Sequence, residues 1–337
     1  MPRSMMDATA EGLLPWHTSS WDALLAARVI GRLPHALLVT GPAGVGKRRL
    51  IAHLAHSLLC PQADGEGNPC GHCRDCALWA AGTHPDYIAI GPDPEGQSDE
   101  IRVDSVRRLA EADALTAHRG RQKVIVIDPA HRMNTAAANS LLKTLEEPSS
   151  GTLLCLICEQ PSGLPATVRS RCQLLRVPVP RESDALAWLT RYAEPAEAPK
   201  LLGLAHGAPL RALALAESGQ LAVRDDLFSG FAAVGHGKRD PIAEAAGWNR
   251  HEPAILLDWL SGWISDVLRL TSGHAAPRLI NTDKVDDLGA LAGRIDPQSC
   301  HQLLRNILRA KAAEGGTLNR LLLYESLLVE WMRVAAG

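Results

Sequence analysis

The sequence GPAGVGKR at residues 41–48 decides the fold of this chain. It fits the phosphate-binding pattern G-x-x-x-x-G-K, in which backbone N–H groups surround phosphate oxygens and a lysine adds a point charge. The residues that carry this chemistry are Gly41, Gly44, Gly46 and Lys47. Arg48 occupies the last position, where Ser or Thr normally binds Mg²⁺ through its hydroxyl. The loop therefore predicts a nucleotide-binding fold that has lost a ligand for its metal.

The residues around the loop provide the setting that the motif requires. Residues 36–39 form an apolar run that predicts a buried strand, and Leu50, Leu54 and Leu58 recur at helical spacing after the loop. A glycine-rich turn unrelated to phosphate is the alternative, but it does not explain a strand before the loop and a helix after it. We therefore predict an α/β core of the P-loop type.

A second apolar segment, KVIVID at residues 123–128, predicts a buried strand that ends in the carboxylate of Asp128. This is typical of a Walker B element, whose Asp helps to hold Mg²⁺. In working ATPases of the AAA+ type a Glu usually follows and orients the attacking water, whereas Pro129 follows here. Alternatively, Asp128 only ends the strand. Because two catalytic parts are missing, we expect no self-contained ATP hydrolysis.

Length and composition favour a soluble protein of two or three domains. The chain has 337 residues, of which 46% are hydrophobic, and its net charge of −2 provides no global basic surface for nucleic acid. No apolar run is long enough to span a membrane, and residues 1–14 lack the pattern of a signal peptide. We expect a cytoplasmic protein whose eight cysteines stay reduced.

Four cysteines have the spacing of metal ligands. Cys70, Cys73 and Cys76 form a C-x₂-C-x₂-C run, and Cys60 lies where the helix after the phosphate loop should end. Four thiolates make a closed tetrahedral Zn²⁺ site with no open position, which is typical of a structural role. An iron–sulfur cluster is the alternative, but the ferredoxin pattern needs a further Cys that residues 77–80 do not contain. We predict structural zinc.

Two other cysteines, Cys155 and Cys158, repeat the C-x₂-C spacing inside the apolar strand predicted at residues 153–157. Side chains three residues apart in a strand point to opposite faces of the sheet. We therefore interpret both as small core residues.

Along the chain, strand and helix patterns alternate up to about residue 178, which predicts a parallel sheet covered on both faces. Helices are expected at residues 13–32 and 134–147, and residues 101–116 are expected to form the tail of a strand and then a helix capped by Asp104. Beyond residue 180 the pattern is helical, with apolar stripes at residues 255–270 and 318–334. Trp259 and Trp263 are interpreted as packing residues of a core or subunit interface, not as a platform for bases.

Several strings together resemble one family. They are SLLKTLEEP at residues 140–148, SRC at 170–172, PHALL at 34–38, the four cysteines, GTHPD at 82–86 and IRVDSVR at 101–107. The set resembles the delta-prime subunits of bacterial DNA polymerase III, which are sliding-clamp loader proteins of the AAA+ class. The resemblance extends from about residue 15 to the last helix near Trp331.

The resemblance implies an AAA+ core with a zinc module at residues 60–76 inside residues 1–178, an all-α lid at residues 179–222, and an all-α collar at residues 223–337. It also implies a hetero-pentamer with gamma/tau and delta subunits, which loads the sliding clamp onto primed DNA for the DNA-directed DNA polymerase, a nucleotidyltransferase. Subunits of this kind have no functional ATP site, although the retained Lys47 leaves binding of ATP or ADP open.

The same resemblance assigns a role to Arg171. In this family the SRC string places an arginine finger at the subunit boundary, where its guanidinium faces the γ-phosphate held by the neighbouring subunit. A planar and permanently charged guanidinium suits that task. A surface salt bridge is the alternative for Arg171, and Arg169 is the alternative finger. The arginine of the lid that normally senses nucleotide is also altered, because Leu210 stands at its place and Arg211 follows.

Two other functions stay open at this point. One is an active gamma/tau-like loader ATPase, which would need a hydroxyl at position 48 and a Glu at position 129. The other is a zinc-containing nucleic-acid-binding module, which would favour a basic and aromatic surface, whereas aromatic residues make up only 4% of this chain. Arg102, Arg107 and Arg108 are candidate DNA contacts, or simply a solvated helix face.

Overall fold

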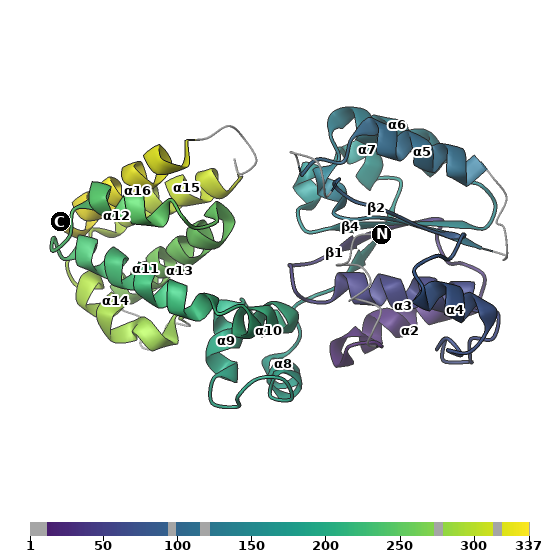
Figure 1. Ribbon diagram of the computed structural model, residues 1–337, viewed down its shortest axis with the longest axis horizontal. Helices are drawn as coiled ribbons and strands as arrows, with labels where there is room; N and C mark the ends of the chain where they lie inside the picture. Colours follow the sequence, from purple (N-terminus) through teal and green to yellow (C-terminus); the bar gives the residue numbers. More distant parts are fainter. Residues whose placement is uncertain (1–11, 94–98, 115–121, 273–278, 313–318, 337) are drawn as a thin grey trace. The chain divides into compact units, whose positions relative to one another are not determined.

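The computed structural model describes residues 12–93, 99–114, 122–272, 279–312 and 319–336. The chain divides into two compact units, Met1–Asp184 and Ala185–Gly337. The first contains the sheet and the second is helical (Figure 1). None of the described helices is both long and apolar enough to cross a lipid bilayer.

The first unit alternates strands with helices. Its elements in chain order are η2 (Pro15–His17), α2 (Thr18–Val29), β1 (Ala36–Thr40), α3 (Lys47–Leu59), α4 (Arg74–Ala80), β2 (Tyr87–Ile90), α5 (Val103–Ala114), β3 (Lys123–Ile127), η3 (Ala130–Arg132), α6 (Thr135–Glu146), β4 (Thr152–Cys158), η4 (Pro161–Gly163), α7 (Ala166–Arg169) and β5 (Gln173–Arg176). This order confirms the predicted strand, phosphate loop and helix at residues 36–59.

The five strands form one parallel sheet in the order β2-β3-β4-β1-β5. Helices α2, α3 and α4 lie on one face of the sheet, and α5, α6 and α7 lie on the other (Figure 1). The three central strands β1, β3 and β4 are buried along their whole length, as expected for strands covered on both faces. Because all strands run the same way, the residues that follow β1, β3 and β4 meet at one edge of the sheet.

Two helix ends show how local sequence sets the boundaries. Asn134 caps α6, because its Oδ1 accepts a hydrogen bond of 2.9 Å from the backbone N–H of Ala137. The predicted cap of α5 is wrong. That helix already begins at Val103, so Asp104 lies in its first turn, where its carboxylate pairs with Arg107 at 3.7 Å. An acidic side chain in the first turn still stabilises the helix, because it lies near the positive end of the helix dipole. The predicted end of this helix at residue 116 lies outside the described residues.

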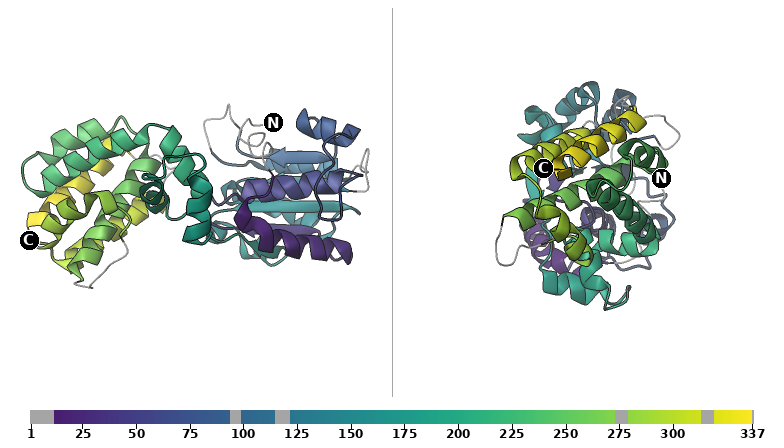
Figure 2. Two further views of the ribbon diagram at one scale, coloured as in Figure 1. Left: turned by 90° about the horizontal axis from the view of Figure 1, so that it is seen from below. Right: turned by 90° about the vertical axis from the view of Figure 1, so that its left-hand side faces the viewer.

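The second unit consists of helices, with α8 (Glu182–Leu189) crossing into it from the first. The others are α9 (Ala198–Leu204), α10 (Pro209–Glu217), α11 (Gln220–Gly235), α12 (Pro241–Trp248), α13 (Pro253–Thr271), η5 (Thr282–Lys284), α14 (Val285–Ala292), α15 (Pro297–Ala312) and α16 (Arg320–Ala336). Figure 2 shows α11 to α16 gathered as one bundle. The predicted boundary between residues 222 and 223 falls inside α11, and the division into lid and collar stays a prediction.

Aromatic residues fill the core of the second unit. Trp263 of α13 lies 5.1 Å from Phe231, measured between ring centroids, and Trp331 stacks on Phe231 at 4.3 Å. Trp259 is also buried in this core. The prediction that these tryptophans serve packing is confirmed, and the packing is internal to the unit. The predicted apolar stripe of the last helix begins at residue 318, which lies outside the described residues.

Candidate functional site

The phosphate loop has the backbone of its motif. Residues 41–46 join β1 to α3, and both Gly44 (φ 80°) and Gly46 (φ 88°) take the left-handed conformation that glycine favours. Gly46 is also enclosed, because a Cβ atom there would lie 2.5 Å from Leu14 Cδ1 and 2.8 Å from the His17 ring. Gly41 is equally restricted, since its Cβ would lie 2.2 Å from the carbonyl oxygen of Val177. Only glycine fits these two positions without movement of their neighbours.

The segment around η2 packs against the outside of this loop. Trp16 donates its indole N–H to the carbonyl oxygen of Val45 at 2.9 Å, and His17 Nε2 lies 3.0 Å from the same oxygen. Burial lowers the pKa of His17 to about 4, so the imidazole is neutral at pH 7. Sequence reasoning missed both contacts, because 28 or more residues separate the partners and no motif links them.

Lys47 is held by the protein itself. Its ammonium group donates a hydrogen bond of 2.7 Å to the carbonyl oxygen of Pro42 in the loop, and lies 3.4 Å from the Glu159 carboxylate. Burial lowers the pKa of Lys47, and the Glu159 carboxylate opposes this shift. Glu159 directly follows β4, the strand that pairs with β1. Its place after a buried strand was the available signal, and sequence reasoning overlooked it.

Arg48 forms an ion pair with Asp128. Its Nε donates to Oδ2 of the carboxylate, and its Nη2 lies 3.4 Å from Oδ1. The Asp128 side chain is 3% exposed, whereas that of Arg48 is 46% exposed. Burial raises the pKa of Asp128, and the Arg48 guanidinium acts in the opposite direction. The residue that replaces the metal-binding hydroxyl therefore forms an ion pair with the retained Walker B carboxylate.

The two loop cations thus face two carboxylates. Lys47 and Arg48 carry positive charge, Asp128 and Glu159 carry negative charge, and all four lie at the edge of the sheet where β1, β3 and β4 end. Their charges balance without any bound ion. The loop retains the backbone of a phosphate-binding loop, but carboxylates of the same chain already pair with its two cations.

Arg171 lies two residues after the end of α7 and is distant in sequence from these four side chains. Its Nη2 lies 2.6 Å from Glu146 Oε1, its Nε donates to the same oxygen at 2.9 Å, and its Nη1 donates to the carbonyl oxygen of Thr167 at 3.0 Å. Its side chain is 36% exposed. Arg169, two residues earlier in the chain, is exposed. Glu146 is the last residue of α6 and belongs to the SLLKTLEEP string, so two of the family strings contact each other here.

Arg211, which follows the predicted sensor position at Leu210, is also paired within the chain. Arg211, at the start of α10, contacts the Asp258 carboxylate of α13, and Lys311 of α15 contacts the same carboxylate. Nearby positive charges lower the pKa of Asp258 despite its burial. Arg211 therefore binds within the second unit.

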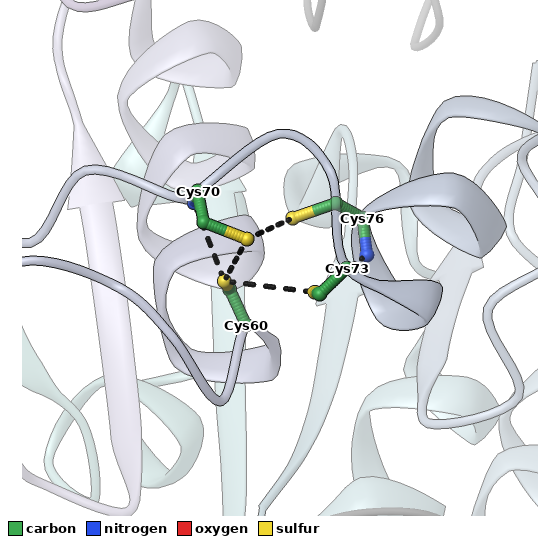
Figure 3. A group of neighbouring side chains, drawn as sticks. All are labelled: Cys60, Cys70, Cys73 and Cys76. Atoms are coloured by element: carbon green, nitrogen blue, oxygen red, sulfur yellow. Dashed lines mark hydrogen bonds between the residues drawn. The ribbon is translucent and has the colours of Figure 1, made fainter.

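The four predicted cysteines converge. Cys60 directly follows α3, Cys73 caps α4 and Cys76 lies within α4, while Cys70 lies on the connection between the two helices (Figure 3). All four Sγ atoms lie within 4.8 Å of one another, and the Cys60–Cys70, Cys60–Cys73 and Cys70–Cys76 pairs are 3.6, 3.9 and 3.8 Å apart. A tetrahedral zinc site with Zn–S bonds of about 2.3 Å requires sulfurs about 3.8 Å apart. The cluster therefore has the ligand type, number and spacing to hold a metal ion.

The surrounding backbone donates hydrogen bonds to sulfurs of this cluster. The N–H of Cys70 donates to Cys60 Sγ and the N–H of Cys76 donates to Cys73 Sγ, each at 3.4 Å. The backbone N–H of His72 lowers the pKa of Cys70 to about 6, whereas burial raises the pKa of Cys60 and that of Cys76. Hydrogen bonds to the charged form favour that form, which is also the form that binds metal. By contrast, Cys155 and Cys158 are buried in β4 outside the cluster, which confirms their interpretation as core residues.

Comparison with known proteins places this geometry in a family. The family model described as "DNA polymerase III, delta subunit" matches residues 16–181, and that described as "DNA polymerase III, delta subunit, C terminal" matches residues 218–333. DNA polymerase III subunit delta' of Pseudomonas aeruginosa is 39% identical over 327 residues, which cover 95% of this chain and 97% of that protein. The chain belongs to the delta' family of DNA polymerase III subunits. The delta' subunit of Escherichia coli is 35% identical over 320 residues, 94% of each chain.

Among solved structures, a DNA polymerase III gamma subunit-related protein of Thermotoga maritima matches with a TM-score of 0.44 and 15% identity, covering 94% of this chain and 99% of that one. This likeness is too distant to support any conclusion. The predicted fold class, an AAA+ core with a four-cysteine module followed by helices, is confirmed for this delta' family member.

Proposed function

We propose that the chain is a clamp-loader subunit of DNA polymerase III that does not hydrolyse ATP itself. Its delta' relatives are named as subunits of that polymerase, and the two family models together match most of the chain. In this role it assembles with gamma/tau and delta subunits and helps to place the sliding clamp on primed DNA. The stoichiometry expected from the family is a hetero-pentamer.

The contact between Arg48 and Asp128 carries the proposal of ATPase inactivity. Phosphoryl transfer in P-loop enzymes needs Mg²⁺ bound by a loop hydroxyl and supported by the Walker B Asp. Here the hydroxyl is replaced by a guanidinium, and that guanidinium holds the carboxylate. A metal ion entering this position would meet a fixed positive charge, which disfavours its binding. Pro129 supplies no base for the attacking water.

The position of Arg171 supports a catalytic role in a neighbouring subunit. The guanidinium is oriented by Glu146 and by the carbonyl of Thr167, and the Arg171 side chain is 36% exposed. An arginine finger needs this combination of fixed orientation and access. In the proposed complex it would contact the γ-phosphate of ATP bound by an adjacent gamma/tau subunit.

We further propose that the four cysteines hold a structural zinc ion. No ligand position remains open in a four-thiolate site, which suits a structural ion. Cys60 ends α3 and Cys73 begins α4, so the ion would join the helix of the phosphate loop to the next helix. Zinc supplies no chemistry for catalysis in this arrangement.

Reconstitution tests the proposed function. The purified chain should release no phosphate from ATP above background, yet gamma/tau and delta subunits should load clamps onto primed DNA only when it is added. Size-exclusion chromatography should place all three kinds of subunit in one complex. Phosphate release by the chain alone that disappears in Lys47→Ala would identify an active ATPase instead. Full loading without the chain would reject the clamp-loader assignment.

A further inference from the structure

An imidazole lies against the four-cysteine cluster. His56 Nε2 is 3.2 Å from Cys76 Sγ. His56 lies on α3 four residues before Cys60, which directly follows the helix, so the helical period places both on one face. Cys76 and Trp79 share a face of α4 in the same way, three residues apart. Two helix faces therefore meet around the cluster, and each contributes one sulfur and one ring.

Stacking fixes the plane of this imidazole. The His56 ring lies 4.9 Å from the Trp79 ring, measured between centroids, with an angle of 9° between the planes. Trp79 is buried and contacts Tyr87 of β2 edge-on at 4.7 Å. The imidazole is thus held between the cluster and the core of the first unit. A ring held in this way loses little further freedom when it forms a hydrogen bond.

With zinc bound, the cluster would be negatively charged, and two of its four cysteines are buried, so a hydrogen-bond donor would stabilise it. Four thiolates around a divalent ion leave two net negative charges, and Cys60 and Cys76 are 4% and 2% exposed. Buried charge is costly unless hydrogen bonds compensate for the lost water. Backbone N–H groups donate hydrogen bonds of 3.4 Å to the Sγ atoms of Cys60 and Cys73. Cys76 is more deeply buried than Cys60. Its contact with the imidazole, at 3.2 Å, is shorter than these two backbone contacts.

We propose that His56 donates its Nε2–H to the metal-bound thiolate of Cys76 and thereby strengthens zinc binding. This inference rests on the proposed zinc site. A sulfur bound to metal carries no proton, so in the contact with His56 it accepts and Nε2 donates. Nδ1 then keeps its lone pair. His56 is a positioning residue, since it acts on the ion only through Cys76.

Two substitutions separate the hydrogen bond from the packing. His56→Phe keeps a ring that can stack on Trp79 but removes the donor. His56→Gln removes the ring but keeps an N–H donor at the end of its side chain. His72→Gln is the control near the cluster, because its exposed ring contacts the carbonyl oxygen of Cys70 and no sulfur. All variants are made in the full chain, and circular dichroism checks their folding.

Zinc dissociation constants are measured by competition with a chelating dye. We expect His56→Phe to bind zinc about 10- to 100-fold more weakly than the wild type, the usual effect of removing such a partner. His56→Gln should stay closer to the wild type, and His72→Gln should equal it. In the cobalt-substituted chain, the thiolate-to-metal absorption band should shift in His56→Phe and much less in His56→Gln.

Wild-type affinity in His56→Phe would overturn the inference, as would equal weakening in both His56 variants, since that pattern indicates packing alone. These results leave the zinc proposal intact. If the wild-type chain itself binds no zinc, the proposed site and the role of His56 fail together.

Discussion

Arg48 places a permanent positive charge where a hydroxyl would bind Mg²⁺, and it already holds Asp128. Arg48→Thr would release that carboxylate and restore the hydroxyl. We expect this variant to bind a fluorescent ADP analogue at least about tenfold more tightly with Mg²⁺ than without, because the metal regains both supports. The wild-type chain should show no such dependence on Mg²⁺. Fluorescence titration with and without EDTA measures the difference.

The control for this experiment is the double substitution Arg48→Thr with Asp128→Asn. The amide cannot replace the negative charge that supports the metal, so the gain from Mg²⁺ should disappear. Identical titrations for the wild type and Arg48→Thr would show that Arg48 does not exclude the metal.

Arg171 is expected to act on ATP held by another subunit. In a reconstituted loader, Arg171→Ala should leave assembly intact but reduce DNA- and clamp-stimulated ATP turnover and slow clamp loading. Arginine fingers contribute roughly 10³ to 10⁵ in rate at a single site, but other sites in the ring keep their own, so the loss in total turnover should be partial. Arg171→Lys should rescue little, since an ammonium cannot reproduce the planar fork.

Arg169→Ala is the matched control two residues away, and its effect should be milder. Clamp loading at the wild-type rate by the Arg171→Ala complex would contradict the finger. It would leave Arg171 only a surface partner of Glu146.

At the scale of elements, the cysteine cluster connects α3 to α4. We expect one zinc ion per purified chain, measured by metal analysis, and expect Cys73→Ser to lose it. Because ligands and local fold form together, hydrogen exchange should increase in residues 60–80 of that variant. The helices of the second unit should keep their protection, since their core contains none of these residues. Iron in place of zinc, or no metal, would reject this prediction.

The contact between η2 and the phosphate loop should depend on pH. The His17 imidazole can make both of its hydrogen bonds only when it is neutral. Nε2–H then donates to the carbonyl oxygen of Val45, and Nδ1 accepts from the N–H of Leu14 at 3.4 Å. In the unfolded chain the His17 imidazole takes up a proton at its ordinary pKa of about 6.5. In the folded chain the pKa of His17 is about 4. The contribution of His17 to the free energy of unfolding is therefore fully present above pH 6.5. It falls as the pH is lowered toward 4, by at most about 3 kcal/mol.

The measurement is thermal unfolding of the first unit at pH 7 and at pH 5. His17→Gln is the matched variant, because its amide can still donate to Val45 but does not titrate. It should lose part of the pH dependence. An unchanged difference between the two pH values would assign the effect to other groups.

For the molecule as a whole, the second unit has a core that can support independent folding. A fragment of residues 219–337 starts just before α11 and keeps Arg224, which is buried and donates to Asp283 at 2.9 and 3.0 Å. We expect this fragment to be helical by circular dichroism and to associate with the loader subunits. A folded fragment that binds none of them would count against the collar assignment.

Much of the site could be predicted because its signals are local. The cysteines lie at the end of α3, at the start of α4 and on the connection between these helices. Their spacing in the sequence was therefore enough to predict that Cys60, Cys70, Cys73 and Cys76 lie together. The loop glycines are likewise defined by neighbouring residues along the chain. The alternation of strands and helices predicted the parallel sheet, since hydrophobic period reports which faces are buried. It did not predict the cap of α5, where a shift of two residues changes the role of Asp104.

The pairs that decide the chemistry were set by tertiary structure alone. Arg48 and Asp128 are 80 residues apart, and Lys47 and Glu159 are 112 apart. They meet because β4 lies between β3 and β1, which brings three strand ends to one edge of the sheet. Local patterns identify strands but not their order, because order follows from how the whole core packs. The sequence thus determined that a metal ligand was missing, and the fold determined that its replacement holds the carboxylate left behind.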